Sequence, residues 1–486
     1  MADKFGTNGN DIINGTADDD FISGGPDGGD PALETGDDEI NGEGGNDTIL
    51  GLGGNDTLTG GDGSDTIEGG DGEDELYGGA GDDTMHGGDG SDVFHGGAGN
   101  DTFDGQGDFD DVWYAGEGGL LGVAVDLAAG TATDTFGDAD TLTSISGIAG
   151  SDLADTLLGD DEDNIIRSFR GDDIVDGRGG SDEAHYTNDQ NLISVTVNLA
   201  AGTAVEVYGD GTSTDTLIGI ERIRGSLGDD SLTGDDGDNR IRGIAGDDLI
   251  DGGGGRDMAD YSQDARYGGN QGVTVDLGTG SAVDGFGDTD TLTGIEDVRG
   301  TMFGDILTGD AGENELGGDG GDDLLDGRAG DDVLDGGGGS DWLIGGSGND
   351  LLIGGGQDGD AAAYIDEGGG GAVTVNLAEG TATDTYGDVD TLVSISDVWG
   401  NDQDDTLIGK NSGEGYEGFR GMGGNDTIVG GSGDSWVYYN SDAGHGGSSG
   451  VTVNLSDEAQ GGQAANSATD GFGDTDTLVN INKVRG

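Results

Sequence analysis

The chain has 486 residues, with 103 Asp and Glu against 16 Lys and Arg, a formal net charge of −87, and 113 glycines. Only 31% of the residues are hydrophobic, so apolar burial alone cannot offset chain entropy and charge repulsion, which excludes an ordinary globular domain. The acidic excess excludes nucleic acid and anionic membranes as partners, because both need Lys and Arg to replace counterions. Since no cysteine is present, hard cations bound by oxygen atoms are the expected source of the missing stability.

A nine-residue repeat runs without a gap from Gly42 to Trp113, after a looser lead-in that an insertion at residues 26–35 interrupts. Each repeat reads G-G-x-G-x-D-x-U-x, where U is a large apolar residue. The sixth-position aspartates, with those of the lead-in, are Asp11, Asp20, Asp38, Asp47, Asp56, Asp65, Asp74, Asp83, Asp92, Asp101 and Asp110.

This period predicts a very short strand at x-U-x and a tight glycine turn with positive φ. One repeat cannot bury its apolar residue, so we expect two repeats to form one turn of a flattened right-handed coil whose turns stack as parallel sheets. Turn carbonyls and aspartates of adjacent turns would then supply the roughly six to eight oxygen ligands that Ca²⁺ prefers. A solvated turn is the alternative interpretation of these aspartates.

A longer unit recurs five times, from Val123, Val195, Val273, Val373 and Val451. Each copy begins with an alternating strand and a turn of small residues, and then carries an acidic cluster. In four copies the cluster reads D-x-x-x-D-x-D and comprises Asp134, Asp138, Asp140, Asp284, Asp288, Asp290, Asp384, Asp388, Asp390, Asp470, Asp474 and Asp476. In the second copy Glu206 and Asp210 hold the first two places, and an insertion displaces the third acid to Asp215. The recurrence suggests a second kind of calcium site, with a solvated loop as the alternative.

Nonapeptides resume after each of the first four long units. Their predicted calcium ligands are Asp155, Asp173, Asp182, Asp230, Asp248, Asp257, Asp305, Asp323, Asp332, Asp341, Asp350, Asp405 and Asp426. The expected fold is all-β, a right-handed parallel β-roll or β-solenoid in which interleaved longer β units form wider turns or small caps. The expected divisions are 1–118, 119–190, 191–268, 269–368, 369–446 and 447–486.

The nonapeptides from Gly42 to Trp113 resemble those of the RTX (repeats-in-toxin) family of secreted, haemolysin-type calcium-binding repeat proteins. The resemblance implies multiple Ca²⁺ ions, an extracellular or cell-surface location, and type I secretion as an unfolded chain that folds on external calcium. Residues 1–7 lack the basic and apolar regions of a Sec signal, and no apolar run is long enough for membrane insertion. Members of the family usually carry their activity in a separate domain, which is not recognisable here, so the chain is not expected to be an enzyme.

A few residues outside the calcium pattern invite a functional interpretation. His86 and His95, nine residues apart, are expected to stack on neighbouring turns as a surface pair and not as a transition-metal site. The G-x-S-x-G sequence around Ser448 lacks a following helix and a triad, so we interpret it as coincidence. Aromatic residues where a repeat run ends are interpreted as core caps, with carbohydrate stacking as the alternative: Trp113, Trp342, Trp399, Trp436, Tyr114, Tyr186, Tyr261, Tyr364, Tyr438 and Tyr439.

The two ends of the sequence suggest end-to-end self-association. Residues 484–486 stop in mid-repeat, and the spacing of Gly6, Thr7 and Asp11 matches the residues that follow an earlier long unit. A head-to-tail contact of this kind generates filaments. The preferred function is therefore a secreted calcium-dependent structural protein of a filament, surface layer or matrix. The alternatives are a truncated piece of a longer adhesin or toxin, and a binding or presentation module that contacts a cell surface or polysaccharide.

Overall fold

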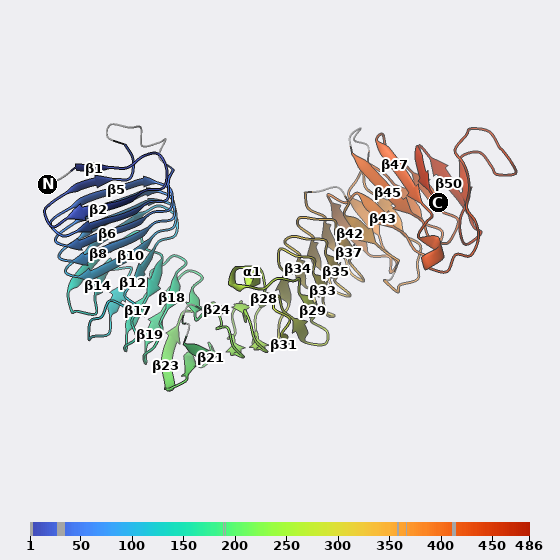
Figure 1. Ribbon diagram of the computed structural model, residues 1–486. Coiled ribbons are helices and arrows are strands. Elements are labelled where there is room, and N and C mark those ends of the chain that lie inside the picture. Colours follow the sequence, from blue (N-terminus) through green and yellow to red (C-terminus); the bar gives the residue numbers. More distant parts are fainter. Residues whose placement is uncertain are drawn as a thin grey trace. The chain divides into compact units, whose positions relative to one another are not determined.

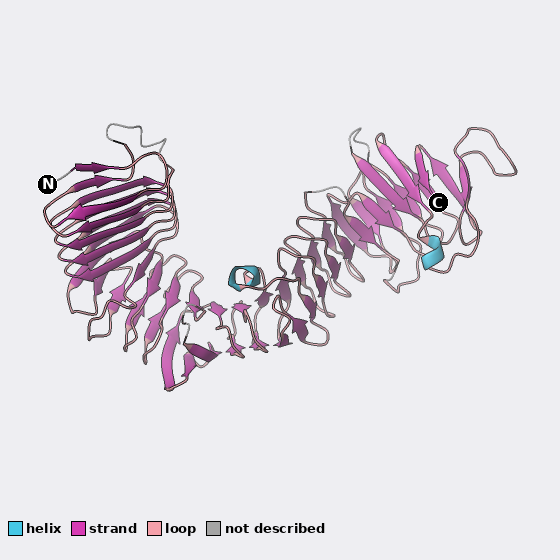
Figure 2. Ribbon diagram, in the orientation of Figure 1, coloured by secondary structure: helices cyan, strands magenta, loops and turns pink. Residues whose placement is uncertain are grey.

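The computed structural model describes residues 3–26, 35–187, 189, 191–356, 359–365, 367–410 and 415–486. Short β-strands account for most of its regular structure, as Figure 2 shows, with a helix α1 (Asp264–Tyr267) and a 3-10 helix at Asp442–Gly444. The chain forms two compact units, residues 1–239 and 240–486, which are built on the same plan. Within the described ranges, no helix has the length and apolar character needed to cross a membrane.

In the first unit the strands alternate along the chain between two sheets, called sheet A and sheet B (Figure 1). Sheet A contains β1 (Asp3–Phe5), β3 (Phe21–Ser23), β5 (Thr48–Gly53), β7 (Thr66–Asp71), β9 (Thr84–Asp89), β11 (Thr102–Gln106), β13 (Ala124–Asp126), β14 (Thr131–Thr133), β15 (Ala139–Thr143), β17 (Thr156–Leu158), β19 (Ile174–Asp176), β21 (Leu192–Asn198), β22 (Thr203–Tyr208), β23 (Gly211–Ile218) and β25 (Ser231–Thr233). Sheet B contains β2 (Ile12–Thr16), β4 (Glu39–Glu43), β6 (Thr57–Asp62), β8 (Glu75–Ala80), β10 (Val93–Ala98), β12 (Asp111–Trp113), β16 (Gly147–Ala149), β18 (Ile165–Arg167), β20 (Glu183–His185) and β24 (Arg222–Arg224).

The second unit has the same two kinds of sheet. Its sheet A contains β27 (Leu249–Asp251), β29 (Thr274–Asp276), β30 (Ser281–Val283), β31 (Thr289–Thr293), β33 (Ile306–Thr308), β35 (Leu324–Asp326), β37 (Trp342–Ile344), β39 (Ala361–Ala363), β43 (Asp397–Trp399), β45 (Tyr416–Arg420), β47 (Asp434–Tyr438) and β51 (Lys483–Arg485). Its sheet B contains β26 (Arg240–Arg242), β28 (Met258–Asp260), β32 (Asp297–Arg299), β34 (Glu315–Gly317), β36 (Val333–Asp335), β38 (Leu351–Ile353), β40 (Thr374–Asn376), β41 (Thr381–Thr383), β42 (Val389–Val393), β44 (Thr406–Ile408), β46 (Thr427–Val429), β48 (Thr452–Asn454), β49 (Ser467–Thr469) and β50 (Thr475–Val479).

The nonapeptides form the parallel β-roll that the sequence predicts. Each repeat supplies one strand, and strands two repeats apart pair in parallel, with Thr48 of β5 opposite Thr66 of β7. The apolar eighth-position residues fill the space between the sheets, and Ile49, Leu58 and Ile67 have no exposed surface. Each turn of 18 residues thus buries two large side chains, which is a thin core for its length.

Two of the glycine positions are needed for the backbone conformation of the turn. The second and fourth residues of a repeat adopt positive φ, for example 111° at Gly61 and 143° at Gly63. Where the second residue is not glycine, as at Leu52 and Gln106, it still adopts positive φ, at 86° and 73°. The stacking of turns holds these residues in a region that L-residues otherwise avoid.

Each long unit forms a three-stranded antiparallel meander within one sheet. In the first copy β13 is antiparallel to β14, and β14 to β15. The outer strands of the meander continue the parallel sheet, since β15 pairs with β11 and β13 with β17. On the opposite sheet a single strand, β16, lies between β12 and β18. A long unit is therefore a wider turn, with three strands on one side and one on the other.

The meanders do not all lie in the same sheet. In the first unit, copies 1 and 2 (β13–β15 and β21–β23) lie in sheet A. In the second unit, copy 3 (β29–β31) lies in sheet A, whereas copies 4 and 5 (β40–β42 and β48–β50) lie in sheet B. Among the described strands, five separate copy 4 from copy 5, and eight separate copy 3 from copy 4.

Candidate metal sites

The sixth-position aspartates form a hydrogen-bonded ladder along the turns. The backbone N–H of Asp47 donates to Oδ1 of Asp65 at 2.7 Å, and that of Asp65 donates to Oδ1 of Asp83 at 2.7 Å. Each bond spans one full turn of 18 residues. The second series of alternate repeats has the same bonds, such as Asp56 to Asp74 at 2.8 Å. One carboxylate oxygen of each aspartate is therefore held by the preceding turn.

The other carboxylate oxygen is buried and accepts no hydrogen bond. This holds for Oδ2 of all eight aspartates of the gap-free block, whose exposed fractions are 2% or less. The residues are Asp47, Asp56, Asp65, Asp74, Asp83, Asp92, Asp101 and Asp110. A buried ionised oxygen without a partner is strongly unfavourable, so each of these atoms requires a proton or a cation.

A backbone oxygen of the next turn faces the same space. A Cβ atom on Gly60, the first residue of its repeat, would lie 2.3 Å from Oδ2 of Asp65 and 2.7 Å from the carbonyl oxygen of Gly78. The φ of Gly60 is not positive, so the glycine is needed here because the two oxygens leave no room for a side chain. Carboxylate and carbonyl oxygens are the ligands that Ca²⁺ takes in proteins. The residues therefore fit a calcium ion, which Asp65 and the carbonyls of the glycine turns would hold.

Within the described ranges, no group of three or more His, Asp or Glu side chains is placed to hold a metal ion. A site in the ladder therefore depends on backbone carbonyls as well as carboxylates. This dependence explains why the glycine turns and the aspartates recur together.

Burial raises the pKa values of aspartates in the ladder. Desolvation raises the pKa of Asp56 to about 8 and the pKa of Asp74 to about 7, against the lowering effect of the backbone hydrogen bond that each accepts. The negative charges of neighbouring ladder residues raise both pKa values further. Without a bound cation, these carboxyl groups would take up protons near neutral pH.

The later nonapeptides continue the ladder. Asp305 donates to Asp323 at 2.7 Å, and Asp332 donates to Asp350 at 2.9 Å. A buried Oδ2 without a hydrogen bond is found in Asp173, Asp182, Asp323, Asp332, Asp341, Asp350 and Asp426. Asp360 also accepts a ladder bond, from Asp341 at 3.1 Å, and the sequence pattern missed it because ten residues separate it from Asp350.

In each of the four predicted ligands that directly follow the first four long units, backbone N–H groups already donate to both carboxylate oxygens. Oδ1 of Asp305 accepts from the backbone N–H of Val273 at 2.7 Å, and Oδ2 accepts from the backbone N–H of Thr301 at 2.6 Å. Asp155, Asp230 and Asp405 make the corresponding bonds after the other copies. These aspartates tie the first strand of the meander to the turn that follows it, so their geometry favours a structural role over ion binding.

The ladder also contains asparagines, which a search for aspartate could not find. Oδ1 of Asn314 accepts from the backbone N–H of Asp310 at 2.8 Å, and its Nδ2 donates to the carbonyl oxygen of Glu296 at 2.8 Å. Asn164 makes the same pair of bonds after copy 1. Because both polar atoms are used, these turns offer no free side-chain oxygen. The shared D-x-x-x-N spacing is the sequence signal that could have identified them.

The three aspartates of a long-unit cluster have separate roles. Oδ1 of Asp134 accepts from three successive backbone N–H groups, including Gly137 and Asp138 at 2.7 Å, and its Oδ2 is buried without a hydrogen bond. Asp140 belongs to the ladder, because its Oδ1 accepts from Asp101 at 3.0 Å. Asp138 is half-buried. Asp284, Asp384 and Asp470 repeat the geometry of Asp134.

A further carboxyl group, half-buried in copy 1 and buried in copies 3, 4 and 5, approaches each of these four clusters from the segment before the meander. Oε2 of Glu117 accepts from the hydroxyl of Thr135 at 2.9 Å, beside the cluster of copy 1. Burial and then the nearby charges of Asp134 and Asp140 raise the pKa of Glu117 to about 8. The corresponding residues of copies 3, 4 and 5 are Asp264, Glu367 and Asp442. No repeat pattern reveals them, because their distance from the cluster along the chain differs between copies.

The acids of copy 2 are satisfied by hydroxyl groups. Oε2 of Glu206 accepts from Tyr208 and from Ser213, each at 2.7 Å. Ser168 donates to Oδ2 of Asp215 at 3.0 Å. Glu206 and Asp215 therefore come together as the sequence predicts. Unlike the first aspartate of the other clusters, however, neither has a bare oxygen, that is, a buried carboxylate oxygen that accepts no hydrogen bond.

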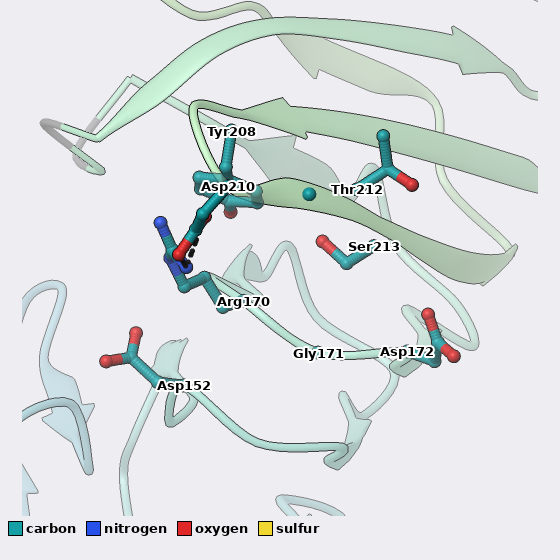
Figure 3. Close-up of a pocket in the computed structure, with 9 residues that line it drawn as sticks. Asp152, Arg170, Gly171, Asp172, Tyr208, Asp210, Thr212 and Ser213 are labelled. Atoms are coloured by element: carbon teal, nitrogen blue, oxygen red, sulfur yellow. Dashed lines mark hydrogen bonds and ion pairs between the residues drawn. The ribbon is translucent and has the colours of Figure 1, made fainter.

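Asp210, the other predicted acid of copy 2, lies away from this pair in an open pocket. Its carboxylate lies 3.1 Å from the Arg170 guanidinium, and Figure 3 shows this pair beside Tyr208. The Arg170 guanidinium lies 4.1 Å from the centre of that ring, and Asp152 and Asp172 also line the pocket. Since the side chain of Asp210 is 73% exposed and paired with a cation, it does not contribute to a buried calcium site.

Two expectations about the other residues are corrected by the structure. His86 lies on β9 in sheet A and His95 on β10 in sheet B, so the predicted stacking of the two is wrong: nine residues are half a turn, not a whole one. The tyrosines at the ends of repeat runs are buried as expected, namely Tyr114, Tyr186, Tyr261, Tyr364 and Tyr439. The four tryptophans and Tyr438 are half-buried on outer faces of the sheets, so their interpretation as core caps is wrong.

A comparison with protein families agrees with this geometry. The profile of the RTX calcium-binding nonapeptide repeat matches residues 5–27, 34–58, 50–85, 59–94, 77–112, 149–184, 215–243, 224–259, 299–334, 326–359 and 419–441, which together make up more than half of the chain. No curated protein matches the chain. With its aspartate ladders and repeated glycine turns, the chain belongs to the RTX calcium-binding nonapeptide repeat family and is a calcium-binding repeat protein.

Proposed function

We propose that this protein is an exported structural protein whose β-roll folds when Ca²⁺ binds to the aspartate ladders outside the cell. The observation that carries the proposal is the repeated pairing of a bare, buried Oδ2 with a carbonyl oxygen of the next turn, as at Asp65 and Gly78. When bound, a divalent cation supplies the positive charge that these oxygens lack. RTX repeats are typical of type I secreted proteins, which supports export by that route.

The thin core supports calcium-dependent folding. Two large apolar side chains per 18 residues contribute too little to offset the backbone entropy of a turn, and the net charge of −87 opposes compaction. Extracellular modules bind Ca²⁺ with dissociation constants of about 10⁻⁴ to 10⁻³ M, so the chain would stay unfolded in calcium-poor cytosol and fold after export.

End-to-end assembly into a filament, surface layer or matrix is the second part of the proposal. Among the described strands, β1 pairs only with β3, and β51 only with β47. In the part of the chain that the structure describes, strand β48 pairs with β49 alone, whereas its counterpart β13 in copy 1 also pairs with a later parallel strand. Such edges accept further strands. They would equally continue into the repeats of a longer adhesin or secreted enzyme, which is the second candidate function.

Circular dichroism of the full chain during a calcium titration tests the first part. We expect a disordered spectrum in excess chelator and a cooperative gain of β-structure near millimolar Ca²⁺, with a much weaker response to Mg²⁺. A fully ordered chain in excess chelator would refute the proposal.

Sedimentation and electron microscopy with and without millimolar Ca²⁺ test the second part. Assembly predicts elongated particles whose length grows with protein concentration. If calcium-loaded chains remain monomeric at every concentration, the structural role as a filament or layer is wrong.

A further inference from the structure

The outer face of sheet A in the second unit carries a row of half-buried aromatic side chains. These residues lie on strands β37, β43, β45 and β47, on the sheet opposite the meanders of copies 4 and 5. We call this surface the aromatic face and define it by Trp342, Trp399, Tyr416, Arg420, Trp436 and Tyr438. The residues between them in the strands, such as Leu343 and Val437, fill the core.

Two tryptophans meet across a strand of alanines. The ring centres of Trp342 and Trp399 are 4.5 Å apart, with an angle of 61° between the planes. Strand β39, which lies between their strands, carries only alanine, and Ala361 and Ala363 are buried although their positions point outward. The small residues therefore leave room for the two rings to lie against the sheet.

A sandwiched arginine continues the row. The guanidinium of Arg420 lies 4.1 Å from the ring centre of Trp399 and 4.4 Å from that of Tyr438. Asp397 lies 3.7 Å from the same guanidinium and accepts a hydrogen bond of 3.0 Å from the hydroxyl of Tyr416. Across β43, β45 and β47, aromatic rings thus alternate with the Arg420 guanidinium and the Asp397 carboxylate.

The last part of the row has the same composition. Trp436 stacks on Tyr438 with ring centres 5.7 Å apart and planes 13° from parallel. The amino group of Lys483 lies 5.0 Å from the centre of the Trp436 ring and 2.6 Å from a carboxylate oxygen of Asp434.

The charge of this face differs from that of the rest of the chain. Only four Lys or Arg residues follow Arg328 in the sequence, and three of them lie in sheet A on the two strands that flank β47: Arg420 on β45, and Lys483 and Arg485 on β51. Asp397 and Asp434 pair with two of these cations. In a chain of net charge −87, the aromatic face is therefore close to neutral.

The first unit has a smaller version of this arrangement, again opposite a meander. On sheet B, Tyr77 stacks on His95 at 4.4 Å, and His95 lies 6.1 Å from Trp113. The guanidinium of Arg167 lies 5.6 Å from the Trp113 ring and pairs with Asp111 at 3.1 Å. These rings lie on the outer face of the sheet and do not fill the core. The same combination of stacked rings with an Arg–Asp pair therefore occurs in both units, which points to a role in ligand binding.

We propose that the aromatic face binds a neutral polysaccharide. The electron-rich faces of Trp and Tyr attract the C–H groups of a sugar ring, and adjacent Arg and Asp side chains donate to and accept from its hydroxyls. A row that crosses several strands fits an extended chain of sugars better than a small ligand. The near-neutral charge favours an uncharged polymer over an acidic one. The inference rests on the proposed function only in that the chain must be folded when it binds.

Affinity electrophoresis of the calcium-loaded full chain tests this proposal, with dextran, hydroxyethylcellulose and soluble starch as neutral probes and polygalacturonate as the acidic one. We expect retardation by at least one neutral polymer and a change in tryptophan fluorescence. Trp399→Ala and Trp436→Ala should each weaken the binding roughly tenfold. Tyr386→Ala, which removes a 48% exposed ring outside the face, should leave it unchanged.

Circular dichroism of every variant in calcium separates loss of binding from loss of fold, and a chelator arm separates this inference from the calcium proposal. A folded chain that binds none of the neutral polymers would overturn the inference, as would binding that both tryptophan variants retain. Preferential binding of polygalacturonate would overturn the choice of a neutral polymer. If the variants abolish self-association and leave sugar binding intact, the face is an interface between copies and the inference fails.

Discussion

The backbone N–H of Asp83 donates a hydrogen bond of 2.9 Å to Oδ1 of Asp101, the equivalent residue of the next turn, while Oδ2 of Asp101 is buried with no hydrogen bond. The two oxygens of one carboxylate thus have different tasks: one connects turns, and the other faces the position proposed for a cation. Substitutions that affect only one of these tasks can therefore separate folding from calcium binding.

Asp65→Asn tests the second oxygen alone. The amide keeps an oxygen for the bond from Asp47 but places an NH₂ group where Oδ2 faces the carbonyl oxygen of Gly78. We expect a loss of about 3 kcal/mol in the free energy of unfolding in millimolar Ca²⁺ and a higher calcium midpoint, measured by circular dichroism. Asp62→Asn, which removes an exposed charge in the same repeat, is the control and should change neither. Equal effects of the two variants would contradict the assignment.

Gly60→Ala tests the space beside the carboxylate. The new methyl group would lie 2.3 Å from Oδ2 of Asp65, so we expect a loss of about 1–3 kcal/mol and weaker calcium binding. Gly44→Ala is a matched control, because its methyl group would lie no closer than 3.5 Å to any atom beyond the two adjacent residues and its φ is not positive. Chemical denaturation in Ca²⁺ measures both, and a larger loss in Gly44→Ala would contradict the prediction.

The chelated chain should become more ordered as the pH falls. The folded-state pKa values of Asp56 and Asp74, about 8 and about 7, lie above the value of about 3.9 for an unfolded aspartate. The folded state therefore binds more protons, so its stability is greatest below about pH 4 and is lost as the pH rises through 7 to 8. Circular dichroism in chelator at pH 4 to 8 checks this, and the calcium midpoint should rise on acidification. Greater order at pH 8 than at pH 4 in chelator would contradict the reasoning.

Asp305→Asn and Asp323→Asn should have different effects. Both oxygens of Asp305 accept hydrogen bonds, so its loss should destabilise the fold by about 2–3 kcal/mol without changing the number of bound ions. Asp323 has a bare Oδ2, so its substitution should lower the ion count. Thermal unfolding in Ca²⁺, with ion counting by atomic spectroscopy after gel filtration, distinguishes the two. A lower ion count in Asp305→Asn would assign that residue to a calcium site.

Much of the fold could be predicted from the period of nine. An apolar residue that recurs between glycine turns defines both the strand and its buried side, which placed Ile49 and Leu58 in the core correctly. The stacking of His86 on His95 does not follow from this period, because successive repeats lie in opposite sheets. Trp113 and Tyr114 were assigned one role, although adjacent residues of a strand end face different sides, one outward and one buried.

The candidate sites were predictable where the ligand is part of the repeat. The ladder aspartates from Asp47 to Asp110 have fixed spacing, and all eight share the same bare oxygen. Glu117 and Asp264 were missed because they approach their clusters through segments of different length. The role of Asp305 depends on a hydrogen bond from the backbone N–H of Val273, 32 residues earlier, and no local pattern encodes that contact.

The sheet in which a meander lies follows a parity rule. Five strands separate copy 4 from copy 5, and both lie in sheet B, whereas the eight described strands after copy 3 move copy 4 to the other sheet. When an odd number of strands separates two meanders, both lie in the same sheet. When the number is even, the second meander lies in the opposite sheet. Duplication of one nonapeptide after copy 3 would therefore transfer every later strand, including those of Trp399 and Trp436, to the opposite side. Duplication of two would only lengthen the molecule, so repeat gain and loss in pairs conserves the display of surface residues.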